Sequence, residues 1–209
     1  GAMWFTEQEG DRLGRITVDG TITTIDLPAN AQPTDLVTGP DGAIWWVGAI
    51  SDLIGRTTVD GSTTTWPMPA KSESNRLIVG PDGRLWANGS NNDSLIAIAM
   101  DGSITSYPLP LKAAEPNGLA SGPDGKVWFA AFNGEAIGSS TVAGTMTTQG
   151  VSAFINDVAF GPDAGLWTGY FDNGAIGRRA QNGDLTDRKL LPGVVFDVLR
   201  RWLTASGYD

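Results

Sequence analysis

The sequence predicts an all-β fold, a five-bladed β-propeller made of four-stranded antiparallel blades. The first observation is a heptapeptide, GPDGAIW, that returns in near-copies along the chain. If a shortened copy at the start is included, the copies of this heptapeptide end at Trp4, Trp45, Trp86, Trp128 and Trp167. The second observation is their spacing of 41, 41, 42 and 39 residues, which is typical of a four-stranded propeller blade. The third is that short segments of β-forming residues alternate with turn residues throughout.

Within each repeat, the pattern predicts four strands separated by tight turns. In the first complete repeat these are an inner strand at 35–38, a second at 43–47, a third at 53–59 and an outer strand at 62–67. Proline fixes φ in the Gly-Pro-Asp-Gly turn, and its last glycine can adopt a positive φ. An Asp-Gly pair then predicts a tight hairpin before the outer strand. We therefore expect the aspartates of this motif to be turn residues.

The two ends of the repeat pattern complement each other. The chain begins at a second strand, whereas Phe196 to Leu199 aligns with the inner strand Asn156 to Ala159. Pairing these ends would complete the fifth blade, as a clasp, and cover two exposed strand edges. We expect a single domain over residues 1–199, with repeats at about 1–32, 33–73, 74–115, 116–154 and 155–193, a closing strand at 194–199 and a tail at 200–209.

Composition restricts the chemistry that these 209 residues can perform. The net charge is −9 with only 14 lysines and arginines, which disfavours binding to nucleic-acid phosphates. No histidine is present, so the commonest general base and transition-metal ligand is missing. No cysteine is present, which excludes thiolate nucleophiles and leaves the cellular compartment open. No apolar run approaches the roughly 20 residues that span a bilayer, so no membrane partner is expected.

Tryptophans occupy two kinds of position in the repeats. The repeated tryptophan stands at a constant strand register, which predicts a residue of the core between blades. Trp46 and Trp66 stand outside that register. These two are candidates for a ligand or partner surface.

Polar residues stand just before the predicted inner strands, where a propeller presents its loops around the mouth of the central channel. The candidates for ligand binding, together with Trp46, are Asn75, Arg76, Asn117 and Asn156. The carboxylates that could bind a metal are Asp35, Asp157 and Asp197, and with Glu7 they are also the candidates for catalysis. Oxygen ligands suit calcium or magnesium. Alternatively, these side chains cap turns and bond to amides at strand ends. The same alternative applies to aspartates of the neighbouring loops, such as Asp11 and Asp52.

The repeat resembles a known family. The segment Trp4-Phe5-Thr6-Glu7, then Leu13-Gly14-Arg15-Ile16-Thr17 and Asp19-Gly20, with Gly-Pro-Asp-Gly before later tryptophans, is similar to the repeat of the virginiamycin B lyases, or streptogramin B lyases. The resemblance covers residues 1 to about 199. The resemblance implies a relationship to seven-bladed enzymes, which linearise a cyclic depsipeptide by elimination and use histidines and a glutamate around a magnesium ion. Here there are five repeats and no histidine, so no catalytic histidine can be transferred.

Together these observations lead us to expect a non-catalytic, lyase-like propeller. It would bind a small molecule or a protein partner, or serve as a scaffold, through the channel-mouth face, and would require no cofactor. One alternative is a metal-assisted lyase or hydrolase that uses carboxylates on a cyclic ester or peptide. Another is a truncated or engineered propeller whose property is ring closure or assembly. A closed five-blade ring would be a monomer, and an incomplete ring would form an oligomer.

Overall fold

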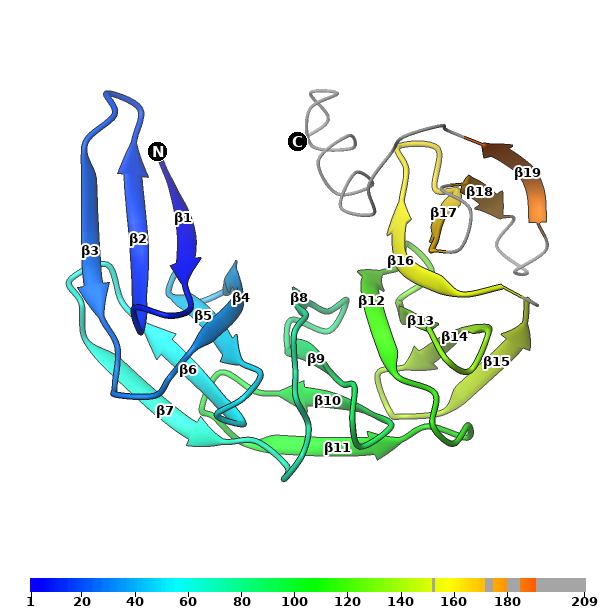
Figure 1. The fold of residues 1–209 in the computed structure, drawn as a ribbon, viewed down its shortest axis with the longest axis horizontal. Helices are drawn as coiled ribbons and strands as arrows, with labels where there is room; N and C mark the ends of the chain where they lie inside the picture. The colour runs from blue at the N-terminus through cyan, green and yellow to red at the C-terminus, as the bar shows by residue number, and fades with distance from the viewer. Residues whose placement is uncertain (152, 172–174, 180–184, 191–209) are drawn as a thin grey trace. The chain divides into compact units, whose positions relative to one another are not determined.

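A computed structural model describes residues 1–151, 153–171, 175–179 and 185–190 of the chain. These residues form nineteen β-strands in five antiparallel sheets, which we call blades 1 to 5 in chain order (Figure 1). Within these residues, no helical segment has both the length and the apolar composition that spanning a bilayer requires.

The strands follow the predicted repeats. Blade 1 consists of β1 (Ala2–Glu7), β2 (Arg12–Thr17) and β3 (Ile22–Asp26). Blade 2 consists of β4 (Pro33–Thr38), β5 (Ile44–Gly48), β6 (Leu53–Thr57) and β7 (Thr63–Pro67). Blade 3 consists of β8 (Leu77–Val79), β9 (Leu85–Gly89), β10 (Ser94–Ile98) and β11 (Ile104–Pro108). Blade 4 consists of β12 (Pro116–Ser121), β13 (Lys126–Ala131), β14 (Ala136–Thr141) and β15 (Met146–Gly150). Blade 5 consists of β16 (Ile155–Phe160), β17 (Leu166–Tyr170), β18 (Ala175–Arg179) and β19 (Leu185–Leu190).

Every blade is a simple meander in which each strand pairs with the next one in the chain (Figure 1). This confirms the predicted four-stranded repeats and the three-stranded first blade. The predicted closing strand at 194–199 and the tail at 200–209 lie outside the described residues, so closure of the ring stays a prediction.

The Gly-Pro-Asp-Gly motif is coupled to the tryptophan that follows it. In blade 2, Gly42 has a φ of 75°, and Asp41 accepts hydrogen bonds from the amide of Ala43 (3.2 Å) and the indole N–H of Trp45 (3.1 Å). Its second carboxylate oxygen accepts a bond from Nε of Arg56 on β6 (2.6 Å). Asp41 is therefore a turn residue, as predicted, and it also orients the tryptophan.

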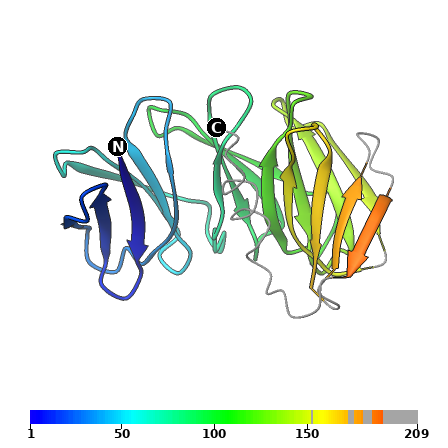
Figure 2. The same cartoon turned by 90° about the horizontal axis from the view of Figure 1, so that it is seen from above.

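The chain divides into two compact units. The first comprises Gly1–Val79 and Gly83–Ser106, and the second Gly80–Asp82 and the described residues from Tyr107 onward. The first has a core between blades 2 and 3 around Trp45, Ile54 and Ile96. The second has a core between blades 4 and 5 around Trp128 and Ile155, where β16 packs beside β12 and β13 (Figure 2). As predicted, the repeated tryptophans at 45, 86 and 128 are buried, whereas those at 4 and 167 are partly exposed.

Candidate functional site

The polar residues predicted to form a rim lie at irregularities of the inner strands. In blade 2, the pairing of β4 with β5 shifts between Pro33 and Asp35, which leaves Thr34 in a β-bulge. The same shift places Asn156 in a bulge of β16. In β12, the shift in register includes Asn117 and Gly118. Because bulges redirect side chains and are common beside functional sites, these positions form the candidate site.

In the first unit, Thr34 and Asp35 connect blade 2 to blade 3. The Thr34 hydroxyl lies within hydrogen-bond distance of the carbonyl oxygens of Val47 (3.0 Å) and Ser74 (3.3 Å). One Asp35 carboxylate oxygen accepts a bond from the amide of Leu36 (3.0 Å), and the other accepts one from the amide of Leu77 on β8 (2.9 Å). The carboxylate that we considered as a metal ligand or base therefore bonds to backbone at the start of the neighbouring inner strand.

In blade 3, a buried asparagine bonds to the residues that precede the inner strand. The side-chain oxygen of Asn88 on β9 accepts bonds from the amides of Asn75 (3.1 Å) and Arg76 (2.9 Å). Its side-chain nitrogen donates to the side-chain oxygen of Asn75 (2.9 Å). These bonds replace strand pairing, which explains why β8 begins only at Leu77.

Sequence reasoning missed Asn88. The signal was available, because the position two residues after the repeated tryptophan holds Val47 in blade 2 and Ala130 in blade 4. An asparagine there is a polar residue in a strand that is otherwise buried, and such a group needs hydrogen-bond partners.

Arg76 keeps hydrogen-bonding capacity. One guanidinium nitrogen, Nη1, donates to the carbonyl oxygen of Asn75 (3.2 Å). The Nε–H group is buried and has no hydrogen-bond partner in the described part of the chain. Since guanidinium carries five N–H donors and Arg76 as a whole is half-buried, Arg76 is the member of the predicted set best able to bond to a ligand oxygen.

In the second unit, the predicted residues bond across blades 4 and 5. The side-chain nitrogen of Asn117 on β12 donates to the side-chain oxygen of Asn156 on β16 (2.8 Å). Asp157 is 1% exposed, and one of its oxygens accepts a bond from the amide of Val158 (3.0 Å). Gly118 packs so closely that a β-carbon there would lie 2.5 Å from Cα of Asp157. Glycine is therefore required at that position.

Two other candidates have structural partners. Glu7, at the end of β1, receives two bonds from Arg12, from Nε at 3.0 Å and from Nη2 at 2.6 Å. Trp46, which we expected to contact a ligand, is fully buried, and its indole N–H donates to Thr57 (3.1 Å). That expectation is wrong, because the ring covers Gly55 on the neighbouring strand, where a β-carbon would lie 2.1 Å from it.

The aspartates of the loops between second and third strands cap the connections between blades. Asp52 accepts bonds from the amides of Lys71 (2.7 Å) and Glu73 (3.0 Å), both of which have positive φ, and from the hydroxyl of Ser72 (2.8 Å). Asp11 does the same for the preceding connection. These two residues follow the capping alternative.

The metal prediction names Asp35 in the first unit, Asp157 in the second and Asp197. Among the described residues, no three acidic side chains gather in an arrangement that could hold a metal ion. Asp197 lies outside these residues. A calcium or magnesium site stays a prediction.

Comparisons with known proteins identify the fold. Residues 1–191 match the model of the virginiamycin B lyase family. A solved streptogramin B lyase is 29% identical, with a TM-score of 0.87 over 93% of this chain and 66% of its own. Virginiamycin B lyase from Staphylococcus aureus is 28% identical, with a TM-score of 0.87 over 92% of this chain and 67% of its own.

A catalytically inactive histidine-to-alanine variant of the Staphylococcus aureus enzyme, solved with quinupristin, is 30% identical, with a TM-score of 0.85 over 92% of this chain and 67% of its own. No curated protein matches the chain. The 209 residues thus span about two thirds of the length of these lyases. The agreement confirms the predicted β-propeller fold, and the chain belongs to the virginiamycin B lyase family.

Proposed function

We propose that this chain is a non-catalytic lyase-like propeller that binds a ligand through the polar ends of its inner strands. The observation that carries the proposal is the absence of histidine from all 209 residues. In the Staphylococcus aureus relative, a histidine-to-alanine variant is catalytically inactive and was solved with quinupristin. Loss of catalysis in that relative is thus compatible with a ligand in the structure.

In this proposal, Glu7, Asp35 and Asp157 do not replace the missing imidazoles. Glu7 is paired with Arg12, and Asp35 bonds to two backbone amides of β4 and β8. Asp157 is buried and bonds to an amide of its own strand. A general base must reach the proton that it removes, so carboxylates that already bond to backbone and to arginine favour a structural role.

Arg76 and Asn75 are the residues that we expect to contact the ligand. Both precede β8 and are half-buried, and the guanidinium of Arg76 carries five N–H donors. An ester or amide carbonyl oxygen of a cyclic depsipeptide is a suitable acceptor. A hydrogen bond from a charged donor contributes about 1.5 to 3 kcal/mol, or about tenfold in affinity at the lower end.

The test combines binding and turnover of quinupristin. We expect calorimetry to show binding, and mass spectrometry to show no linearised product with or without Mg²⁺. Arg76→Ala should weaken binding about tenfold or more. Arg76→Lys is the matched control, because it keeps the positive charge but removes the planar set of guanidinium donors.

Two results would overturn the proposal. Mg²⁺-dependent linearisation that is lost in Asp35→Asn would establish the metal-assisted alternative. Failure of quinupristin to bind, together with a solution mass of several chains, would favour a role in assembly.

A further inference from the structure

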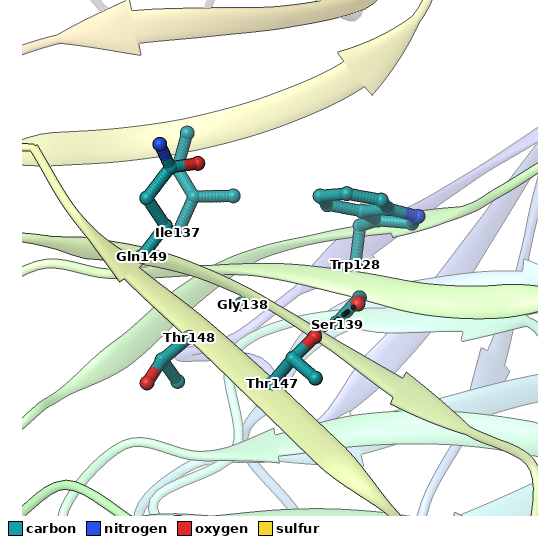
Figure 3. Close-up of a pocket in the computed structure, with 7 residues that line it drawn as sticks. All are labelled: Trp128, Ile137, Gly138, Ser139, Thr147, Thr148 and Gln149. Carbon is teal, nitrogen blue, oxygen red and sulfur yellow. Dashed lines mark hydrogen bonds between the residues drawn. The ribbon is translucent and has the colours of Figure 1, made fainter. Parts of the chain in front are cut away.

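A pocket of about 180 Å³ opens on one face of blade 4, and none of the polar residues described above lines it (Figure 3). Its described walls come from β13, β14 and β15. The indole of Trp128 stands on one side, and Ile137 and Gln149 stand on the other (Figure 3). None of the described lining side chains is charged.

Strand register relates this pocket to a filled place in blade 2. In blade 4, Ile137 on β14 pairs with Gln149 on β15. In blade 2, the equivalent Ile54 on β6 pairs with Trp66 on β7. Gln149 therefore occupies the position that holds an indole in blade 2, and Trp128 corresponds to Trp45.

An aromatic ring occupies the equivalent space in blade 2. The rings of Trp66 and Trp45 are stacked, with centroids 5.5 Å apart and planes 13° apart. Trp66 also packs against Gly102 in the hairpin of blade 3, where a β-carbon would lie 2.1 Å from the indole.

Blade 3 has a tyrosine at the equivalent position. Tyr107 follows Gly102 by five residues, as Trp66 follows Gly61. It packs against Gly144 in the hairpin of blade 4, where a β-carbon would lie 2.2 Å from the ring. Blade 4 has the exposed Gln149 in place of such a ring.

We propose that the blade 4 pocket binds one neutral, planar aromatic ring of a small molecule, stacked on Trp128 as Trp66 stacks on Trp45. A cavity of about 150 Å³ accommodates benzene, so a pocket of this size accepts a single or compact fused ring. Ser139 and Thr147, whose hydroxyl oxygens lie 3.0 Å apart, provide acceptors at its wall. An indole, which has one N–H donor on an apolar ring, matches this combination.

The site is independent of the function proposed for the inner-strand ends, and indole itself is the probe that tests it. We expect calorimetry to show saturable binding of indole to the wild-type chain. Gln149→Trp should weaken this binding at least about tenfold, because the new side chain fills the blade 4 pocket as Trp66 fills the equivalent space in blade 2. Gln149→Ala is the control, because it leaves the blade 4 pocket open and should keep the affinity for indole within about threefold of that of the wild-type chain.

A reciprocal variant tests whether an equivalent pocket can be created in blade 2. Trp66→Gln opens the equivalent space beside Trp45, so a second molecule of indole should bind to that variant. Three results would overturn the proposal: no saturable binding to the wild-type chain, equal binding by Gln149→Trp, or tighter binding of a tryptophan-containing peptide than of free indole. The last result would assign the pocket to a protein partner.

Discussion

The repeated tryptophan can be tested most directly at Trp45, by replacement with alanine. The side chain is fully buried and stacks on Trp66, and its N–H group donates to Asp41. It lies in the core between blades 2 and 3 with Val47, Leu77 and other apolar residues. The substitution therefore removes packing, a ring contact and one hydrogen bond.

The expected cost follows from these three losses. An indole buries about 200 Å², which at about 25 cal/mol per Å² sets an upper bound of about 5 kcal/mol for the hydrophobic contribution. Truncation of a buried aromatic residue to alanine costs about 3 to 5 kcal/mol. The stack with Trp66 adds about 0.5 to 1.5 kcal/mol. Asp41 keeps its bonds from Arg56 and the Ala43 amide, so the lost indole bond adds little.

We therefore expect Trp45→Ala to lower the free energy of unfolding by about 3.5 to 6.5 kcal/mol. Trp45→Phe keeps a stacked ring and should lower it by only about 1 to 2 kcal/mol. Urea unfolding followed by far-UV circular dichroism measures both. The exposed Thr64 on β7 is the control, since Thr64→Ala should change stability by less than about 0.5 kcal/mol. A loss below about 1 kcal/mol for Trp45→Ala would refute the assignment of this residue to the core.

Two further predictions concern the aspartates of the turns and loops. Asp52→Ala removes the acceptor for Lys71, Ser72 and Glu73 and should lower the free energy of unfolding by about 2 kcal/mol, with a smaller loss for Asp52→Asn; equal stability by urea unfolding would argue against the capping role. Hydrogen bonds from Arg178 and the Gly165 amide lower the pKa of Asp163 below its usual 3.8. A carboxylate with a lowered folded-state pKa stabilises the fold above its unfolded pKa, so this contribution should be lost as the pH falls below about 4 through the folded value. The thermal midpoint, measured from pH 7 to pH 2, should decline less steeply in Asp163→Asn, and an identical decline would contradict this.

The sequence predicted the blades because their determinants are local. The Gly-Pro-Asp-Gly turn, the positive φ of Gly42 and the bond from Trp45 to Asp41 all lie within seven residues. Each repeat therefore contains the information for its own strands and turns, and a period of about 40 residues indicates a propeller. The absence of histidine, which carries the proposed function, is likewise a property of sequence alone.

The state of the polar residues depended on tertiary structure. Asp35 bonds to the amide of Leu77, 42 positions along the chain, and Asn117 bonds to Asn156 in the next blade. The spacing of residues along one strand does not reveal whether a carboxylate accepts a hydrogen bond from an amide of a neighbouring blade. Trp46 is similar, because its burial depends on Gly55 of the adjacent strand.

Sequence by itself thus determined the repeat, the turns and the positions of polar side chains along each strand. Only the tertiary structure decided which of these side chains bond to neighbouring blades, that Arg76 keeps a donor, and that blade 4 has a pocket where blade 2 has Trp66. The physical reason is that turns form through contacts between near neighbours in the chain. Hydrogen-bond satisfaction and packing instead depend on groups that the fold brings together from different repeats.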